Sequence, residues 1–163
     1  MSLAYVGLGS NLSDPQAQIA SALDKLMQLE HCVVRAVSSL YFSRPMGPQD
    51  QPDYMNAVVA IETSLSPEAL LDQLQDIENS AGRVRKDNRW GARILDLDIL
   101  LFDQQIINTE RLTVPHYGLK LREFVLLPLA EIAAELVLPD GDTIAALADQ
   151  IENNGLKIHS KLG

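Results

Sequence analysis

The most constraining feature of the sequence is the alternation at residues 95–100, which reads LDLDIL. Successive side chains of a strand point to opposite faces, so this stretch predicts a half-buried strand whose apolar residues enter a core. Asp96 and Asp98 then project from the other face, roughly 6–7 Å apart. Two carboxylates on one face of a half-buried strand repel each other unless a cation lies between them. Hard oxygen donors in this arrangement favour Mg²⁺.

A cluster of cations precedes this strand. The stretch 83–93 holds five basic residues opposed only by Asp87: Arg83, Arg85, Lys86, Arg89 and Arg93. Guanidinium groups bind phosphate oxygens in a bidentate manner, and carboxylates hold a metal that bridges phosphates. The two features together favour a site for a magnesium nucleotide, whereas each alone is typical of an ordinary surface loop or a structural acidic pair.

The remaining composition excludes several classes of protein. The net charge of −9 argues against a general nucleic-acid binder. The single cysteine, Cys32, excludes a disulfide framework, and no apolar run approaches the roughly 18 residues of a membrane span. The first residues lack the features of a signal peptide. We expect one domain covering 1–163, a cytoplasmic location and no membrane or nucleic-acid partner.

The periodicities predict an α+β fold. Apolar runs at 3–8, 33–42, 54–63 and 95–102 are of strand length, and helices are expected to begin at Pro15 and Pro67. This order is βαββαβ, the ferredoxin-like core: an antiparallel sheet with helices on its faces, followed here by a C-terminal extension. A short helix is expected to open at Pro128 and a last helix to be capped by Asp142, and residues 153–163 are expected to be frayed.

Polar residues near these elements form a second group of candidates. Tyr54 and Asn56 share one face of their predicted strand and would suit a flat heterocycle, although such a pair is more often structural. Glu78 lies in the last turn of its helix, where a carboxylate opposes the helix dipole, which indicates a polar partner. His116 follows a proline in a fixed turn and is a plausible phosphate contact.

At these residues the chain resembles a known family, the 6-hydroxymethyl-7,8-dihydropterin pyrophosphokinases of folate biosynthesis. The most specific segment is RWGARILDLDIL at 89–100. GPQDQPDYMNA at 47–57, GRVRK at 82–86 and INTERLTVPHY at 107–117 are similarly close to the family pattern. The resemblance implies transfer of pyrophosphate from ATP, the co-substrate, to a reduced pterin alcohol, with AMP as the other product.

The resemblance also implies roles for individual residues. Asp96 and Asp98 would hold two Mg²⁺ ions, and Arg83 and Arg93 would be catalytic by stabilising the transferring phosphates. The ATP site would comprise Glu78, Arg83, Arg85, Arg93, Ile99, Arg111, Thr113, His116, Tyr117 and Arg122. The pterin site would comprise Ser43, Met46, Tyr54, Asn56, Trp90 and Phe124. Two mobile loops, 43–53 and 82–93, would close over the substrates, and we expect a monomer.

The chain departs from the family pattern in two segments. Ser43-Arg44-Pro45-Met46 stands where the family often has Thr-Pro-Pro-Leu, and Ala92 stands where proline is common. Two other functions remain open from the residues alone. A polymerase palm also combines paired aspartates with this fold but needs a nucleic-acid surface, which the net charge disfavours. A ligand-sensing module would explain Tyr54 and Asn56 but not the aspartates beside five cations.

Overall fold

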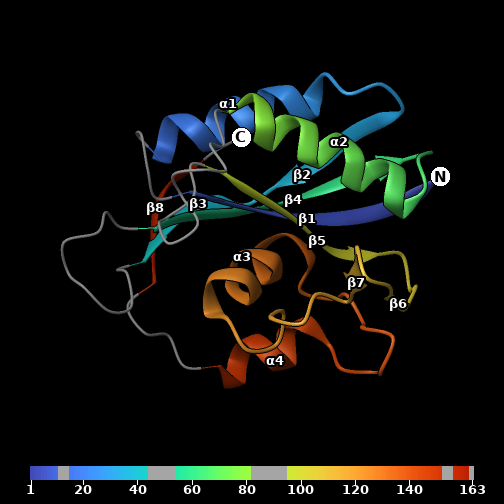
Figure 1. The fold of residues 1–163 in the computed structure, drawn as a ribbon. Coiled ribbons are helices and arrows are strands. Elements are labelled where there is room, and N and C mark those ends of the chain that lie inside the picture. Colours follow the sequence, from blue (N-terminus) through green and yellow to red (C-terminus); the bar gives the residue numbers. More distant parts are fainter. Residues whose placement is uncertain (11–14, 44–53, 82–94, 152–155, 162–163) are drawn as a thin grey trace.

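The computed structural model of the protein describes residues 1–10, 15–43, 54–81, 95–151 and 156–161. Strand β1 (Ser2–Ser10) lies inside the sheet, antiparallel both to β4 (Tyr54–Thr63) and to β5 (Asp96–Phe102). Strand β3 (Ser39–Ser43) pairs with β4 and with β8 (Lys157–Lys161), and β2 (Cys32–Val37) also pairs with β4. The order is therefore β5-β1-β4-β3-β8, with β2 beside β4 (Figure 1).

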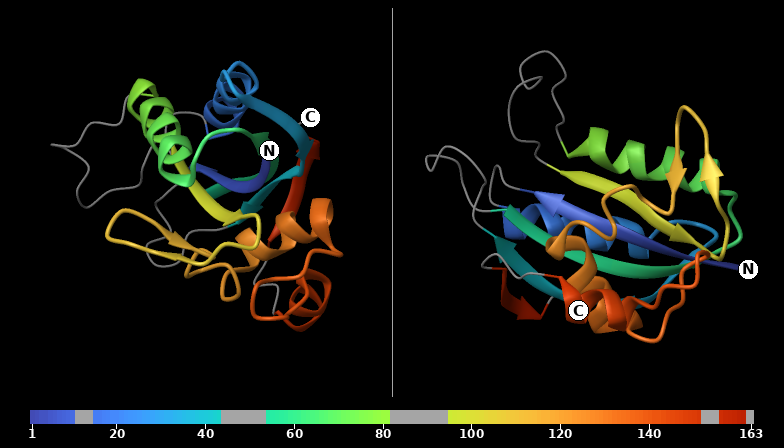
Figure 2. Two further views of the ribbon diagram at one scale, coloured as in Figure 1. Left: turned by 90° about the vertical axis from the view of Figure 1, so that its right-hand side faces the viewer. Right: turned by 90° about the horizontal axis from the view of Figure 1, so that it is seen from below.

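Helices cover both faces of the sheet (Figures 1 and 2). Helices α1 (Pro15–Met27) and α2 (Pro67–Ser80) bury their apolar stripes against one face. Helices α3 (Glu123–Ala133) and α4 (Ile144–Gln150) pack on the other, where they form a second apolar cluster. A small hairpin of β6 (Ile107–Asn108) and β7 (Thr113–Val114) follows β5. The expected α+β fold, with an antiparallel sheet and helices on its faces, is confirmed.

The first two helices begin where the sequence predicts. Ile19, Ala22, Leu23 and Leu26 are the buried residues of α1. The Ser66 hydroxyl accepts a hydrogen bond from the backbone N–H of Ala69 at 3.2 Å and so caps α2. Among the described helices, none has the length and apolar character needed to cross a membrane.

The predicted strand at 33–42 is instead two strands, interrupted at Ser38. The Ser38 hydroxyl accepts a hydrogen bond from Val58 N at 2.9 Å and donates one to Ser39 O at 2.8 Å. A side chain thus replaces part of the backbone ladder, so the pairing with β4 breaks and resumes. Both pieces still pair with β4, as expected for one continuous strand.

The prediction that a helix opens at Pro128 was wrong, because Pro128 lies inside α3. Proline removes one backbone hydrogen bond inside a helix and costs roughly 3 kcal/mol. Here the helix buries Val125, Leu126 and Leu129 against the sheet, together with Pro128 itself. This burial offsets the cost of the proline.

Two further predictions about the C-terminal part were also wrong. Thr143, not Asp142, caps α4, since its hydroxyl accepts from the backbone N–H of Ala146 at 3.3 Å. Asp142 accepts instead from Lys120 Nζ at 2.7 Å. Residues 157–161, expected to be frayed, form β8 because the outer edge of β3 offers them backbone hydrogen-bond partners.

Candidate active site

A cavity of about 650 Å³ lies on the α3 side of the sheet, beside the N-terminal end of that helix. Its floor is β1, where Gly9 pairs with Asn56 on one side and Asp96 on the other. Cross-strand partners project to the same face, so Asn56 and Asp96 flank a position that has no side chain. Asp98 in turn pairs with Gly7, the second floor glycine. Tyr54, Asn56, Asp96 and Asp98 all line the cavity, so the face that Tyr54 shares with Asn56 is also the face of the two aspartates.

The two floor glycines differ in how much space they have. A Cβ atom at Gly9 would lie 3.1 Å from Asn56 Oδ1, tighter than ordinary contacts. A Cβ atom at Gly7 would lie 3.5 Å from the Leu100 side chain, an ordinary contact. The absence of a side chain at position 9 thus gives the Asn56 amide its room.

Asn56 is also the polar group that most clearly lacks a partner. Its side chain is buried, and its Nδ2 is the one buried side-chain nitrogen or oxygen of the described residues without a hydrogen bond. Such an unsatisfied amide nitrogen costs roughly 1–3 kcal/mol. Its position at the cavity wall allows Nδ2 to donate a hydrogen bond to a bound molecule.

The two aspartates fit a divalent cation by their chemistry. Asp96 is half-buried and Asp98 is exposed at the cavity. Within the described ranges, no group of three or more His, Cys, Asp and Glu residues could by itself hold a metal ion. A hard cation bound by two carboxylates would therefore take its remaining oxygen ligands from phosphate and water, as Mg²⁺ commonly does.

Glu78 has the polar partner that its unfavourable position in the helix predicts. Its side chain is buried, and Oε2 accepts a hydrogen bond from Leu97 N at 2.8 Å. Leu97 lies between Asp96 and Asp98 on β5, which pairs with only one strand among the described residues. A carboxylate of α2 therefore anchors the edge strand at the point where it presents the two aspartates.

The turn after β7 brings His116 to the cavity. His116 N donates to Leu100 O at 3.0 Å, and His116 Nδ1 accepts from Gly118 N at 3.1 Å. In the neutral imidazole the proton then resides on Nε2, which is free to donate. Burial lowers the pKa of His116, while the charge of Asp98 raises it and that of Arg122 lowers it further. The neutral donor form is accordingly favoured at pH 7.

Arg122 and Phe124 line the cavity at the start of α3. The Arg122 guanidinium lies 5.7 Å from the centre of the Phe124 ring and 5.1 Å from that of Tyr117. Phe124 faces the same cavity as Tyr54. The Tyr54 ring of β4 and the Phe124 ring of α3 can therefore both contact a flat ligand.

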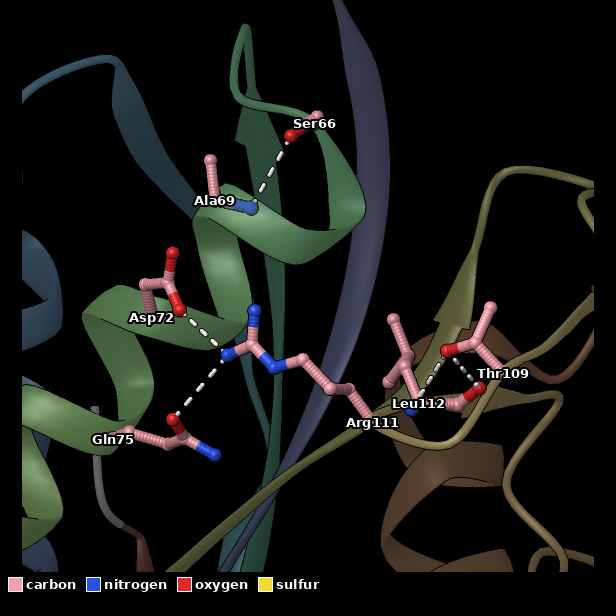
Figure 3. A network of polar contacts seen from close by, with 7 residues as sticks. All are labelled: Ser66, Ala69, Asp72, Gln75, Thr109, Arg111 and Leu112. Carbon is pink, nitrogen blue, oxygen red and sulfur yellow. Dashed lines mark hydrogen bonds and ion pairs between the residues drawn. The ribbon is translucent and has the colours of Figure 1, made fainter.

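Other predicted residues lie elsewhere in the described part of the chain. Arg111 donates to Asp72 Oδ1 at 2.6 Å and to Gln75 Oε1 at 3.4 Å, so it is held against α2 (Figure 3). Ile99 is buried in the apolar cluster that α1 and α2 form with the sheet. Thr113 is exposed on β7. Tyr117 is 70% exposed, and its ring stacks on His116. None of these four is among the residues that line the cavity.

Ser43 lies at the end of β3, where its backbone pairs with that of Tyr54. Five of the predicted site residues lie outside the described residues: Met46, Arg83, Arg85, Trp90 and Arg93. Conversely, Leu121 and Glu123 line the cavity without having been singled out. They alternate in sequence with Arg122 and Phe124, just before and at the start of α3. No periodic pattern in the sequence marks them as cavity residues.

The sequence matches a known protein family over most of its length. Residues 5–134 match the family described as 7,8-dihydro-6-hydroxymethylpterin-pyrophosphokinase (HPPK). The chain belongs to the HPPK family. It is 54% identical over 154 residues to a Haemophilus influenzae protein, covering 94% of this chain and 96% of the relative. It is 56% identical over 137 residues to a Pseudomonas aeruginosa protein, covering 84% of each. Both are named 2-amino-4-hydroxy-6-hydroxymethyldihydropteridine pyrophosphokinase.

Solved structures agree with the HPPK fold. Plasmodium falciparum HPPK-DHPS with pteroate matches with a TM-score of 0.72 at 16% identity, covering 91% of this chain and 42% of that one. A second HPPK-DHPS structure, in complex with substrates, gives a TM-score of 0.71 at 14% identity and 45% coverage of its chain. The present chain thus spans less than half the length of these solved chains, and the likeness concerns the fold alone.

Proposed function

We propose that this HPPK-family protein transfers the pyrophosphoryl group of ATP to 6-hydroxymethyl-7,8-dihydropterin in folate biosynthesis. The observation that carries the proposal is the row across three strands, in which only Gly9 separates Asn56 from Asp96. An amide that lacks a partner suits a heterocycle, and a carboxylate pair suits a metal-bound polyphosphate. The two substrates would therefore meet above the floor glycines.

The pterin is proposed to occupy the Asn56 side of the cavity. The Asn56 amide nitrogen would donate to an acceptor of the pterin ring and so recover its missing hydrogen bond. Tyr54 and Phe124 would contact the faces of the ring. Ser43, Met46 and Trp90 are proposed to complete this subsite, as the resemblance of the whole chain to the family implies.

The nucleotide is proposed to occupy the aspartate side. Asp96 and Asp98 would hold two Mg²⁺ ions, which when bound neutralise the phosphate charge. His116 would donate from Nε2 to a phosphate oxygen, and Arg122 would contribute a positive charge. The proposed set of ATP contacts also includes Glu78, Arg83, Arg85, Arg93, Ile99, Arg111, Thr113 and Tyr117.

The reaction requires positioning and charge stabilisation rather than a protein nucleophile. The pterin hydroxymethyl oxygen would attack the β-phosphorus of ATP, forming one P–O bond. The bond from the β-phosphorus to the oxygen shared with the α-phosphorus would break, and AMP would leave. Arg83 and Arg93 are proposed to stabilise the transferring phosphates. The hydroxymethyl proton would pass to solvent or to a phosphate oxygen.

Segments 43–53 and 82–93, which apart from Ser43 lie outside the described residues, are proposed to act as two loops that close over both substrates and exclude water. We also propose that 1–163 acts as a single monomeric domain in the cytoplasm. Cys32 is a buried free thiol, which is compatible with a reducing compartment.

The test is turnover by purified wild-type protein, Asp96→Asn and Asp98→Asn with ATP, Mg²⁺ and the pterin alcohol. Wild-type protein should form AMP only when both the pterin and Mg²⁺ are present. Each variant should lose turnover by about two orders of magnitude or more, because a ligand to the phosphate-bridging metal is removed. Asp24→Asn, an exposed aspartate on α1, is the matched control and should retain turnover.

Other outcomes would contradict the proposal. Formation of ADP would mean ordinary phosphoryl transfer. Ligand binding by wild-type protein without AMP formation would favour the ligand-sensing module, and in that case Asp96→Asn should keep its response to ligand.

A further inference from the structure

Gly118 lies in a turn that backbone hydrogen bonds connect to β5 and to the start of α3. His116 N donates to Leu100 O on β5, and Leu119 N donates to His116 O, each at 3.0 Å. Gly118 O accepts from Arg122 N at 3.1 Å, just before α3 begins. The Leu119 side chain is buried in the core on the α3 side of the sheet. This turn therefore has little freedom to move relative to the cavity.

The Gly118 position has no room for a side chain because Arg122 occupies the space. A Cβ atom there would lie 2.8 Å from Arg122 Nε, 2.9 Å from Cδ and 3.1 Å from Cζ. Contacts this short are repulsive, so Arg122 would have to move. The backbone of Gly118 is not in the left-handed region, unlike that of Gly141. Alanine could therefore adopt the same backbone, and what glycine provides here is space.

The Arg122 side chain passes through the space at Gly118, and its guanidinium lies beside two aromatic rings. Its Cζ is 5.1 Å from the centre of the Tyr117 ring and 5.7 Å from that of Phe124, and Nη2 donates to the Tyr117 hydroxyl at 3.4 Å. The Tyr117 ring also stacks on His116, with centres 4.5 Å apart. Arg122 thus connects His116 and Tyr117, proposed for the nucleotide, with Phe124, proposed for the pterin.

We propose that Gly118 is a positioning residue: its lack of a side chain lets Arg122 cross the turn and place one cation between the two substrate subsites. The inference rests on the proposed function for the assignment of those subsites. Gly118 also contributes its N–H to His116 Nδ1. That hydrogen bond would survive in alanine, whereas the path of Arg122 would not.

The kinetic test is a double-mutant cycle of wild type, Gly118→Ala, Arg122→Ala and the double variant. Gly118→Ala should lower kcat/KM for the pterin by about tenfold, as expected when a cation is removed from an aromatic site. If Gly118 acts through Arg122, the double variant should match Arg122→Ala alone. Additive losses, or full activity in Gly118→Ala, would overturn the proposal.

Two controls separate positioning from a merely structural role. Lys120→Ala alters the same turn but removes only surface ion pairs to Asp140 and Asp142, so it should keep activity within about twofold. A structural role for Gly118 would lower the melting temperature equally with and without Arg122. If Gly118→Ala does not fold, the proposal requires the double variant to fold, because the clash is gone. Failure of both variants to fold would overturn it.

A measurement without turnover keeps this inference distinct from the proposed reaction. The Nε–H proton of Arg122 should be shifted in the NMR spectrum by the rings of Tyr117 and Phe124, and Arg122→Lys would assign the signal. In Gly118→Ala the signal should move toward the position of an unstacked arginine. An unchanged signal would overturn the positioning role. Absence of AMP with the wild-type protein would instead count against the reaction.

Discussion

At the scale of single residues, the cavity depends on Asn56 and on the glycine beside it. The sequence predicts that Asn56 shares a face with Tyr54, because the alternation of Met55, Ala57 and Val59 assigns the other face to the core. It does not predict that Asn56 Nδ2 is buried without a partner. The room for this amide depends on Gly9, which belongs to a strand distant in sequence and pairs with Asn56 through the sheet register. Register arises from long-range pairing and so cannot be derived from local pattern.

Replacing the Asn56 amide by an apolar side chain of similar size should separate stability from function. In Asn56→Leu the unsatisfied buried nitrogen disappears, so the melting temperature should stay the same or rise. The KM for the pterin should rise by about tenfold or more, since a ring acceptor then faces an apolar group. Thermal unfolding and steady-state kinetics measure the two effects. An unchanged pterin KM would show that Asn56 does not bind this substrate.

At the scale of elements, α2 determines how β5 presents its aspartates. The dipole argument identified Glu78 as a residue in need of a polar partner, and the partner is Leu97 N. The sequence could not name that partner, because it lies on an edge strand separated from the helix by residues 82–94. Glu78 therefore anchors β5, and its contact with ATP stays a prediction.

Removing the Glu78 carboxylate should weaken both the edge of the sheet and metal binding. Glu78→Ala leaves Leu97 N without this acceptor and should cost roughly 1–3 kcal/mol of unfolding free energy. The Mg²⁺ concentration for half-maximal turnover should rise, because Asp96 and Asp98 flank Leu97. Glu78→Gln keeps an acceptor oxygen and should restore most of the stability.

Denaturant titrations and Mg²⁺-dependent turnover measure these effects. Asp76→Ala, an exposed carboxylate on the same helix, is the control and should change stability by less than about 0.5 kcal/mol. The anchoring role would be wrong if Glu78→Ala changed neither quantity more than Asp76→Ala does.

A second link between elements joins β3 to α3. The Glu131 carboxylate accepts from the Tyr41 hydroxyl at 2.7 Å and from Ser39 N and Oγ at 2.9–3.0 Å. Burial raises the pKa of Tyr41 well above its usual value of 10.0, and the Glu131 hydrogen bond and charge raise it further. Tyr41 pairs with Asn56 across β3 and β4, so this link lies next to the proposed pterin subsite.

The Tyr41 link should give a dependence of stability on alkaline pH. The unfolded chain ionises Tyr41 near pH 10 while the folded protein keeps the proton, so its contribution is present below pH 10. It should be lost as the pH rises from there toward the folded-state pKa. Tyr41→Phe should be less stable by roughly 1–3 kcal/mol at pH 8, with a smaller loss above pH 10. Denaturant unfolding at pH 8 to 11 measures this, and parallel curves for the two proteins would refute it.

At the scale of the whole molecule, the order of elements was predictable up to β5 and less so beyond it. The strands and first two helices follow from apolar periodicity and from caps such as Ser66, which act locally. Helix α3 depends on burial against the sheet, which overrides the presence of Pro128, and β8 depends on the free edge of β3. Both are tertiary effects. The cavity is likewise a product of assembly, since its residues come from β1, β4, β5, α3 and the turn before α3.

The measurement that most directly tests the account follows the two terminal phosphorus atoms of ATP. Parallel reactions would contain Mg²⁺, the pterin alcohol and ATP labelled with ³²P at either the β or the γ position. Pyrophosphoryl transfer predicts that both labels appear in the pterin product and that unlabelled AMP is released. If only the γ label reached the pterin, or if neither did, the central claim would be contradicted.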